Sequence, residues 1–281
     1  MSLTILAPTD FSRAARNAIT YATEMAKRMK AKLILFHVYL PPIPASELPM
    51  IIPLPAESES YILKRLKRLK NDLHSIRGNK NLDIEVAFTC GVPVDEIYLY
   101  SLSQKVDFVV MGMQGKSFLR EKLMGSTTTS LIQKSEIPVL SIDKKIKFKT
   151  PKKIVFASEN RNPLSKQTLQ PLSKLCSVYK SHIYILNVVT SSSALSGSNI
   201  IHDKTISNTF KNFDHSIHQI ISHTIMQGLS DFIAEKHMDM IVMIPHQHSF
   251  MERVLVGRQS KEMAFHSTIP LLTLRDKIDV H

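Results

Sequence analysis

Asp107 to Leu140 is the stretch that decides the fold, and it reads DFVVMGMQGKSFLREKLMGSTTTSLIQKSEIPVL. The apolar run Phe108–Met111 is too short for a helix and is followed by glycine, which predicts a buried parallel strand. A helix is predicted to begin at Gly125, and Ile137–Leu140 is predicted to be another short strand. The glycines between these elements follow the spacing G-x2-G-x9-G-S.

The loop between the predicted strand and helix has the composition of an anion site. Glycines let backbone N–H groups approach a ligand closely, and the first turn of a helix offers unpaired N–H donors at the positive end of its dipole. Hydroxyl groups and a lysine ammonium add further partners for phosphate oxygens. The alternative is an ordinary connection with turn glycines, but the strands on both sides favour phosphate binding. The residues concerned are Gly112, Gly115, Lys116, Gly125, Ser126 and Thr127.

The same loop partly matches a second phosphate-binding motif. Gly115-Lys116-Ser117 looks like the end of a Walker A loop, G-x4-G-K-[ST]. The first glycine of that motif would have to stand at position 110, which is Val110. A Walker A loop also leads directly into its helix, whereas this loop continues to Gly125. The Walker A interpretation is therefore rejected.

These residues resemble the nucleotide-binding branch of the universal stress protein family. That branch is marked by G-x2-G-x9-G-[ST] between a strand and the last helix of the domain, and by a closing strand of the Pro-Val type. Gly112, Gly115, Gly125 and Ser126 match the motif, and Ile137-Pro138-Val139 matches the ending.

The resemblance implies an adenine nucleotide, ATP or AMP, with or without Mg. The segment Pro8-Thr9-Asp10 and the end of the strand at His37-Val38 would hold the adenine and the ribose. Asp10 would accept hydrogen bonds from ribose hydroxyls, and Val38 would meet adenine through its backbone; the alternative for Asp10 is a helix N-cap with no ligand role. The complete expected cofactor site comprises Pro8, Thr9, Asp10, Val38, Met111, Gly112, Met113, Gly115, Lys116, Gly125, Ser126 and Thr127.

Strands and helices are predicted to alternate along the whole chain, which is typical of parallel crossovers and a doubly wound sheet. Ligands bind such a sheet at the carboxyl ends of strands where the strand order reverses, which would place Asp10 opposite the glycine loop. The first predicted helix has Ser12 or Asp10 as its N-cap. Further strands are expected at 3–7, 33–38, 82–88, 153–158 and 183–188, and helices at 14–29, 62–76 and 94–102.

The second half of the sequence repeats the first. Residues 239–272 align with 107–140 without gaps at an offset of 132 residues, and Asp239 and Gly257 stand at the positions of Asp107 and Gly125. The α/β fold expected is therefore two tandem doubly wound, Rossmann-like parallel-sheet domains, at 1–146 and 147–281.

The repeat loses the features of the anion site in its second copy. Gly112 becomes Ile244, Gly115 becomes Gln247, Ser126 becomes Arg258 and Asp10 becomes Glu159. Side chains at 244 and 247 would fill the space where backbone meets phosphate. The second domain is therefore predicted to be a structural or regulatory partner that does not bind nucleotide in the same way.

Composition limits the other classes of function. The N-terminus lacks the pattern of a signal peptide and no apolar run is long enough for a membrane helix, so a cytoplasmic protein is expected. The net charge of +12 is densest at Lys64–Lys70, where leucines at helical spacing predict one packed face and one solvated basic face. A contact with DNA, RNA or an acidic membrane is the alternative for that face, and the lack of interleaved aromatic residues weighs against single-strand binding.

Two segments carry weaker predictions. The proline-rich segment 41–55 is expected to be a packed connector or dimer contact, with a lid over the ligand as the alternative. Ten of the twelve histidines lie from His182 onward; His246 and His248 fall in the degenerate loop, while His215, His218 and His223 suggest a helix. Packing or surface histidines are expected there, with a transition-metal site as the alternative.

The sequence predicts a nucleotide-dependent stress-response regulator and no dedicated catalytic residue. Phosphoryl transfer needs metal ligands and an oriented nucleophile as well as a phosphate site, so slow ATP hydrolysis is the most that is expected. An adenylyl- or phosphoryl-transferring enzyme on the same fold is the alternative. Self-association through the last strand, as a dimer, is expected unless the two domains of one chain satisfy that pairing internally.

Overall fold

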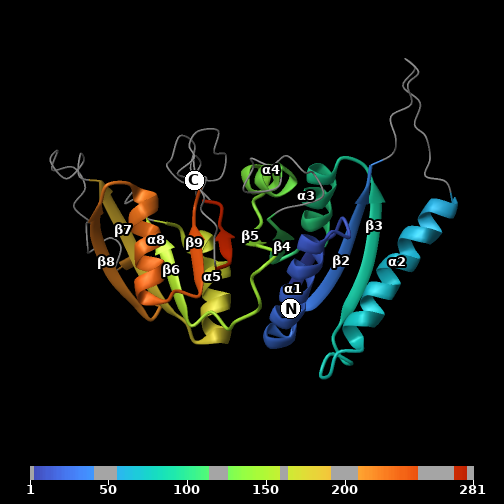
Figure 1. Cartoon of the computed structure of the whole chain (residues 1–281), viewed down its shortest axis with the longest axis horizontal. Helices are drawn as coiled ribbons and strands as arrows, with labels where there is room; N and C mark the ends of the chain where they lie inside the picture. The colour runs from blue at the N-terminus through green and yellow to red at the C-terminus, as the bar shows by residue number, and fades with distance from the viewer. Residues whose placement is uncertain are drawn as a thin grey trace, which may run out of the picture.

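In the computed structural model, the strands of the protein form a single ten-stranded sheet (Figure 1). The structure describes residues 3–40, 56–113, 126–158, 164–190, 208–245 and 269–276. The order of the strands is β3-β2-β1-β4-β5-β10-β9-β6-β7-β8, so the first half of the chain supplies one end of the sheet and the second half the other. The bounds are β1 Thr4–Pro8, β2 Lys32–Tyr39, β3 Ile84–Cys90, β4 Phe108–Gly112, β5 Val139–Ile142, β6 Lys153–Ala157, β7 His182–Thr190, β8 His215–Ser222, β9 Met240–Met243 and β10 Leu271–Thr273.

Helices cover both faces of this sheet. One apolar cluster joins the sheet to α1, α2 and α5, and a second joins its other face to α3, α4 and α8. The inner strands β1, β4, β5, β9 and β10 are nearly continuous runs of buried residues because both of their faces are covered. The bounds are α1 Arg13–Met29, α2 Ala56–His74, α3 Pro93–Ser103, α4 Ser126–Lys134, α5 Lys166–Tyr179 and α8 Ile225–Lys236.

Neighbouring strands run parallel within each half, which confirms the predicted tandem of doubly wound domains. The two halves meet at the seam, the antiparallel pair β5–β10, in which Val139 lies opposite Thr273 and Leu140 opposite Leu272. Thr273 Oγ1 also donates to the carbonyl oxygen of Val139 at 3.1 Å. The last strands of the two domains are therefore paired inside one chain. The exact domain boundary at 146/147 stays a prediction.

The segment between β5 and β6 is held at the same seam. Phe148 lies between the rings of Tyr21 in α1 and Tyr179 in α5, with centroid distances of 4.9 and 6.5 Å. Burial raises the pKa of Tyr21, and the nearby Tyr179 and Asp239 raise it further. Helices from the two halves thus share one aromatic contact through the linker.

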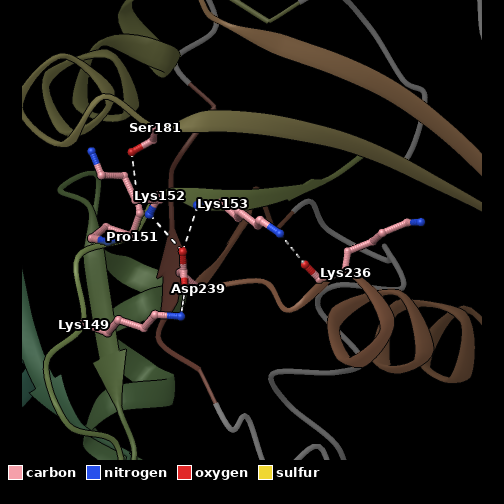
Figure 2. Close-up of polar contacts among 7 residues, drawn as sticks. All are labelled: Lys149, Pro151, Lys152, Lys153, Ser181, Lys236 and Asp239. Carbon is pink, nitrogen blue, oxygen red and sulfur yellow. Dashed lines mark hydrogen bonds and ion pairs between the residues drawn. The ribbon is translucent and has the colours of Figure 1, made fainter.

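Asp239, at the start of β9, ties this linker to the sheet (Figure 2). Its Oδ2 accepts hydrogen bonds from the backbone N–H groups of Lys152 and Lys153, both at 2.9 Å. The Lys149 ammonium forms an ion pair with Oδ1 at 2.6 Å. Asp107 makes the matching contact in the first half by accepting from the N–H of Thr4 at 2.8 Å. Asp107 and Asp239, which align in the sequence repeat, therefore have the same structural role: each carboxylate accepts backbone N–H hydrogen bonds.

One helix prediction is wrong. The segment that carries His215 and His218 is strand β8, not a helix, and His223 follows its end. The three histidines gave a spacing compatible with a helix, but Ile217, Ile220 and Ile221 favour a strand, and β7 offers it eight backbone partners in register. Tertiary pairing outweighed the histidine spacing.

The basic helix is confirmed with one change. Ile62, Leu66 and Leu73 are buried as predicted, but α2 ends at His74, and Ile76 is 49% exposed instead of packed. The proline-rich segment 41–55, the serine-rich segment 191–198, His246 and His248 lie outside the described residues, so the predictions for them stay untested. No helix in the described ranges combines the length and the hydropathy needed to cross a membrane.

Candidate functional site

The strand order of the first half reverses between β1 and β4. From β1 the chain continues to β2 and β3 on one side, whereas β4 and β5 lie on the other. Parallel sheets place ligands at the carboxyl ends of the strands that flank such a reversal. The residues that follow β1 and β4 are therefore the first place to search for a site.

The turn after β1 is fixed by hydrogen bonds at every residue. Thr9 N–H donates to Phe36 O in β2 at 2.8 Å, and Thr9 O is 2.6 Å from Nδ1 of His37. Thr9 Oγ1 accepts from the N–H of Phe11 at 3.0 Å, and Asp10 Oδ1 accepts from the N–H of Ser12 at 2.8 Å. The half-buried Asp10 carboxylate is thus held in one orientation at the carboxyl end of β1.

The helix that follows begins with a side-chain cap. Ser12 Oγ accepts from the N–H of Ala15 at 3.1 Å, so Ser12 is the N-cap of α1. Of the two N-cap candidates, the structure selects Ser12. Asp10 lies two residues before this N-cap, and its Oδ1 accepts from the N–H of Ser12.

The end of β4 lies against the start of α1. A Cβ added to Gly112 would lie 2.8 Å from the carbonyl carbon of Ala14 and 2.9 Å from its oxygen. Real Cβ atoms do not approach backbone this closely, so only glycine permits the contact. The contact places the Asp10 turn and the Gly112–Met113 segment side by side, with Met113 N–H bonded to Ile142 O at 3.0 Å.

Helix α4 is attached directly to this strand end. Thr128 Oγ1 in its first turn donates to the carbonyl oxygen of Gly112 at 2.9 Å. The first residues of α4, Ser126 and Thr127, are exposed and half-buried, respectively. The start of α4 is therefore tied to the carboxyl end of β4, where the sequence predicted the phosphate site.

Nine of the predicted cofactor residues can be placed. Pro8 ends β1, Val38 lies one residue before the end of β2, and Met111 and Gly112 end β4. These strand ends lie at one edge of the sheet because β2, β1 and β4 are parallel neighbours. Gly115, Lys116 and Gly125 lie outside the described residues. The placed residues are Pro8, Thr9, Asp10, Val38, Met111, Gly112, Met113, Ser126 and Thr127.

Sequence reasoning missed an aromatic and cationic contact beside this edge. Phe11 has a φ of 61°, in the left-handed region that is unusual for a residue with a side chain. The Arg65 guanidinium of α2 lies 3.8 Å from the centroid of the Phe11 ring, and the His37 ring lies 4.8 Å from it on another side. Arg65 is therefore not part of a fully solvated basic face. The Asp-Phe-Ser sequence at 10–12 was the available signal, since a bulky residue in a tight turn needs a neighbour to cover it.

The second half differs at the corresponding place. Ile244, which replaces Gly112, is only 5% exposed and belongs to the apolar cluster that also contains Phe156 and Phe210. Its side chain is part of the core where the first half has none. Glu159, Gln247 and Arg258 lie outside the described residues. Within the described ranges, no three His, Cys, Asp or Glu side chains are grouped so that they could hold a metal ion.

The family model described as "Universal stress protein family" matches residues 1–142, more than half of the 281 residues. The chain belongs to the universal stress protein family. Its tandem arrangement agrees with this match, since one copy of the family domain accounts for the first half alone.

Relatives of this universal stress protein match at two lengths. Universal stress protein MJ0577 of Methanocaldococcus jannaschii is 31% identical over 153 residues, and the match covers 50% of this chain and 94% of that protein. Universal stress protein MJ0531 of the same organism is 29% identical over 145 residues, and the match covers 50% of this chain and 81% of that protein. A solved universal stress protein of Archaeoglobus fulgidus covers 97% of this chain and 98% of its own, with a TM-score of 0.69 and 17% identity. That structure shows that both halves together form a fold known from another protein.

Proposed function

We propose that this universal stress protein binds an adenine nucleotide, ATP or AMP, at the carboxyl edge of β1, β2 and β4, and acts as a nucleotide-dependent regulator of a stress response. The observation that carries the proposal is the contact between Gly112 and Ala14. It brings the Asp10 turn against the strand end to which α4 is attached. A sugar-binding carboxylate and a phosphate-binding helix start would then lie on the two sides of one edge.

Each placed residue has a chemical role in this proposal. Asp10, held by Ser12 N–H, would accept hydrogen bonds from ribose hydroxyls. The backbone of Val38 would meet the adenine edge. The N–H groups in the first turn of α4, with the hydroxyls of Ser126 and Thr127, would face phosphate oxygens. The glycines at 115 and 125 and Lys116 would complete the phosphate site, as the sequence motif predicts.

The second half would contribute stability and regulation instead of a second nucleotide site. Ile244 occupies core volume at the position where the first half needs a residue without a side chain. A binding stoichiometry of one nucleotide per chain follows. Nucleotide that bound equally to both halves would contradict this assignment.

The test compares ligands with and without a sugar. Titration calorimetry of the full chain with ATP, AMP and inorganic triphosphate gives three affinities, and Asp10→Ala is then measured with the same ligands. Loss of a charge-assisted hydrogen bond costs about 1.5–3 kcal/mol, so ATP and AMP are expected to bind about 10-fold to 100-fold more weakly to the variant. The affinity for triphosphate is expected to change little.

Glu159→Ala is the matched control, because Glu159 stands at the position of Asp10 in the degenerate half. It is expected to leave all three affinities unchanged. Equal weakening of ATP and triphosphate by Asp10→Ala would remove Asp10 from the sugar site. Incubation with labelled ATP separates the regulator from a transferase, since a regulator retains about one nucleotide per chain and a transferase turns it over.

A further inference from the structure

Four side chains near the start of β7 and β8 form a row of polar contacts, far along the sheet from the proposed nucleotide edge. Asp214 Oδ1 lies 3.0 Å from Nδ1 of His182. Nε2 of His182 lies 2.9 Å from Oγ of Ser216, and the same Oγ lies 2.8 Å from Nε2 of His218. A carboxylate, an imidazole and a serine hydroxyl in this order are the arrangement that activates serine nucleophiles on several unrelated folds.

The register of the two strands explains why these residues meet. Ser216 lies opposite Tyr184, and His218 lies opposite Leu186. Register-paired residues of parallel strands point to the same face of a sheet, and every second residue of a strand does so. His182, Ser216 and His218 therefore share the face covered by α8, where the His218 ring lies 5.2 Å from that of Phe232.

When both imidazoles are neutral, counting protons selects one arrangement of these contacts. The His182 proton then lies on Nδ1, which faces Asp214, and Nε2 is an acceptor. The Ser216 hydroxyl must donate to that Nε2, and its oxygen accepts the Nε2–H of His218. Burial, together with the positive charge of Lys236, lowers the pKa of His218, so a neutral His218 agrees with this arrangement. The serine proton therefore points at the imidazole that is oriented by a carboxylate.

We propose that Ser216 is a nucleophile that takes up an acyl group from a small activated ester or thioester, with His182 as its general base and Asp214 as the residue that positions His182. The row is open to solvent, since the His182 side chain is 31% exposed and that of Asp214 78%. The rings of Tyr184 and Phe232 beside it are apolar surfaces suited to a short acyl chain.

The reaction balances within these groups. Ser216 Oγ attacks the carbonyl carbon of the ester while its proton moves to His182 Nε2. The tetrahedral intermediate then releases the alcohol or thiol, which takes the proton from His182 Nε2 as its bond to carbon breaks. The products are acyl-Ser216 and the free alcohol or thiol, and attack by water on the acyl group restores the serine.

The strand supplies a donor for the carbonyl oxygen. Ile183 N–H donates to Asp214 O at 2.9 Å, so the main chain of Asp214, and by alternation that of Ser216, points toward β7. The N–H of Ile217 consequently points away from β7, and in the described part of the chain β8 has a partner strand on that one side only. A backbone N–H directly after the nucleophile is the donor that other serine enzymes use for the oxyanion.

The experiment uses a fluorophosphonate, which forms a stable bond with activated serines, on the full folded chain. Mass spectrometry of peptides locates the label, and Ser222 in the same strand serves as the internal comparison. Labelling of Ser216 is expected, and p-nitrophenyl acetate is expected to acetylate the same residue. Labelling of Ser216 no faster than that of Ser222 would overturn the proposal.

Two substitutions separate a base from a structural contact. His182→Gln is expected to lower the labelling rate of Ser216 by at least about 100-fold, as expected for loss of a general base. His223→Gln, an exposed histidine just after β8, is the matched control and is expected to leave the rate unchanged. Circular dichroism and Tm of both variants show whether the fold is intact. A folded His182→Gln variant that labels as fast as the original chain would contradict the proposed role.

Discussion

Gly112 lies where β4 meets the first turn of α1, and the backbone of Ala14 leaves no room for a side chain there. Gly112→Ala is expected to lower the free energy of unfolding by about 1–3 kcal/mol, because the added methyl group forces the strand and the helix apart. Urea unfolding followed by circular dichroism measures the change. Ser130→Thr adds a methyl group at an exposed position of α4 and is expected to cost under about 0.5 kcal/mol. Equal costs for the two variants would show that the Gly112 contact is not tight.

The same glycine shows how far residue-level reasoning reaches. The sequence predicts that position 112 is special, because its glycine belongs to a spaced set and is replaced by Ile244 in the repeat. The reason it gives, close approach of backbone to a phosphate, is incomplete. The structure shows that Gly112 first allows β4 and α1 to touch, a contact between residues almost a hundred positions apart that no local pattern contains.

Among the elements, α2 is the one whose surface differs most from the simple expectation. Arg65 lies over the Phe11 ring, whereas Arg68 on the same helix is exposed. Arg65→Gln is therefore expected to lower the free energy of unfolding by about 0.5–2 kcal/mol through loss of the cation–π contact and of apolar packing. Arg68→Gln is expected to change it by less than about 0.5 kcal/mol. Thermal unfolding of the two variants checks the difference, and a larger effect at Arg68 would rule out an anchoring role for Arg65.

Strand β8 shows why some elements could not be predicted. Its residues include two histidines and two serines, which have weak preferences, and the spacing of the histidines suggested a helix. The strand forms because β7 presents a parallel edge to it from Ile183 to Thr190. The long apolar runs of β1, β2 and β4, by contrast, were predicted within one or two residues, since burial on both faces leaves a continuous signal.

At the scale of the whole molecule, the repeat in the sequence predicted two similar domains but left open whether their last strands pair with each other or with a second chain. The pairing of Val139–Ser141 with Leu271–Thr273 extends one sheet through both halves and covers the edge that a single domain would leave open. Lys174 of α5 adds an ion pair of 2.6 Å to Asp107, across the same seam. Side chains from both halves therefore depend on one another for their partners.

This joining predicts that the two halves unfold as one cooperative unit, with Phe148 as a main link between α1 and α5. Phe148→Ala removes the ring that fills the space between Tyr21 and Tyr179 without changing a side chain of either sheet. It is expected to lower stability by about 1–3 kcal/mol and to reduce cooperativity, because the packing within each half remains while the contact between α1 and α5 weakens. Scanning calorimetry measures both effects: the original chain should give equal calorimetric and van't Hoff enthalpies, and the variant a van't Hoff enthalpy that is the smaller of the two. Lys147→Ala, at an exposed neighbouring position, should behave as the original chain does. Two separate transitions in the original chain would show that the continuous sheet does not couple the halves.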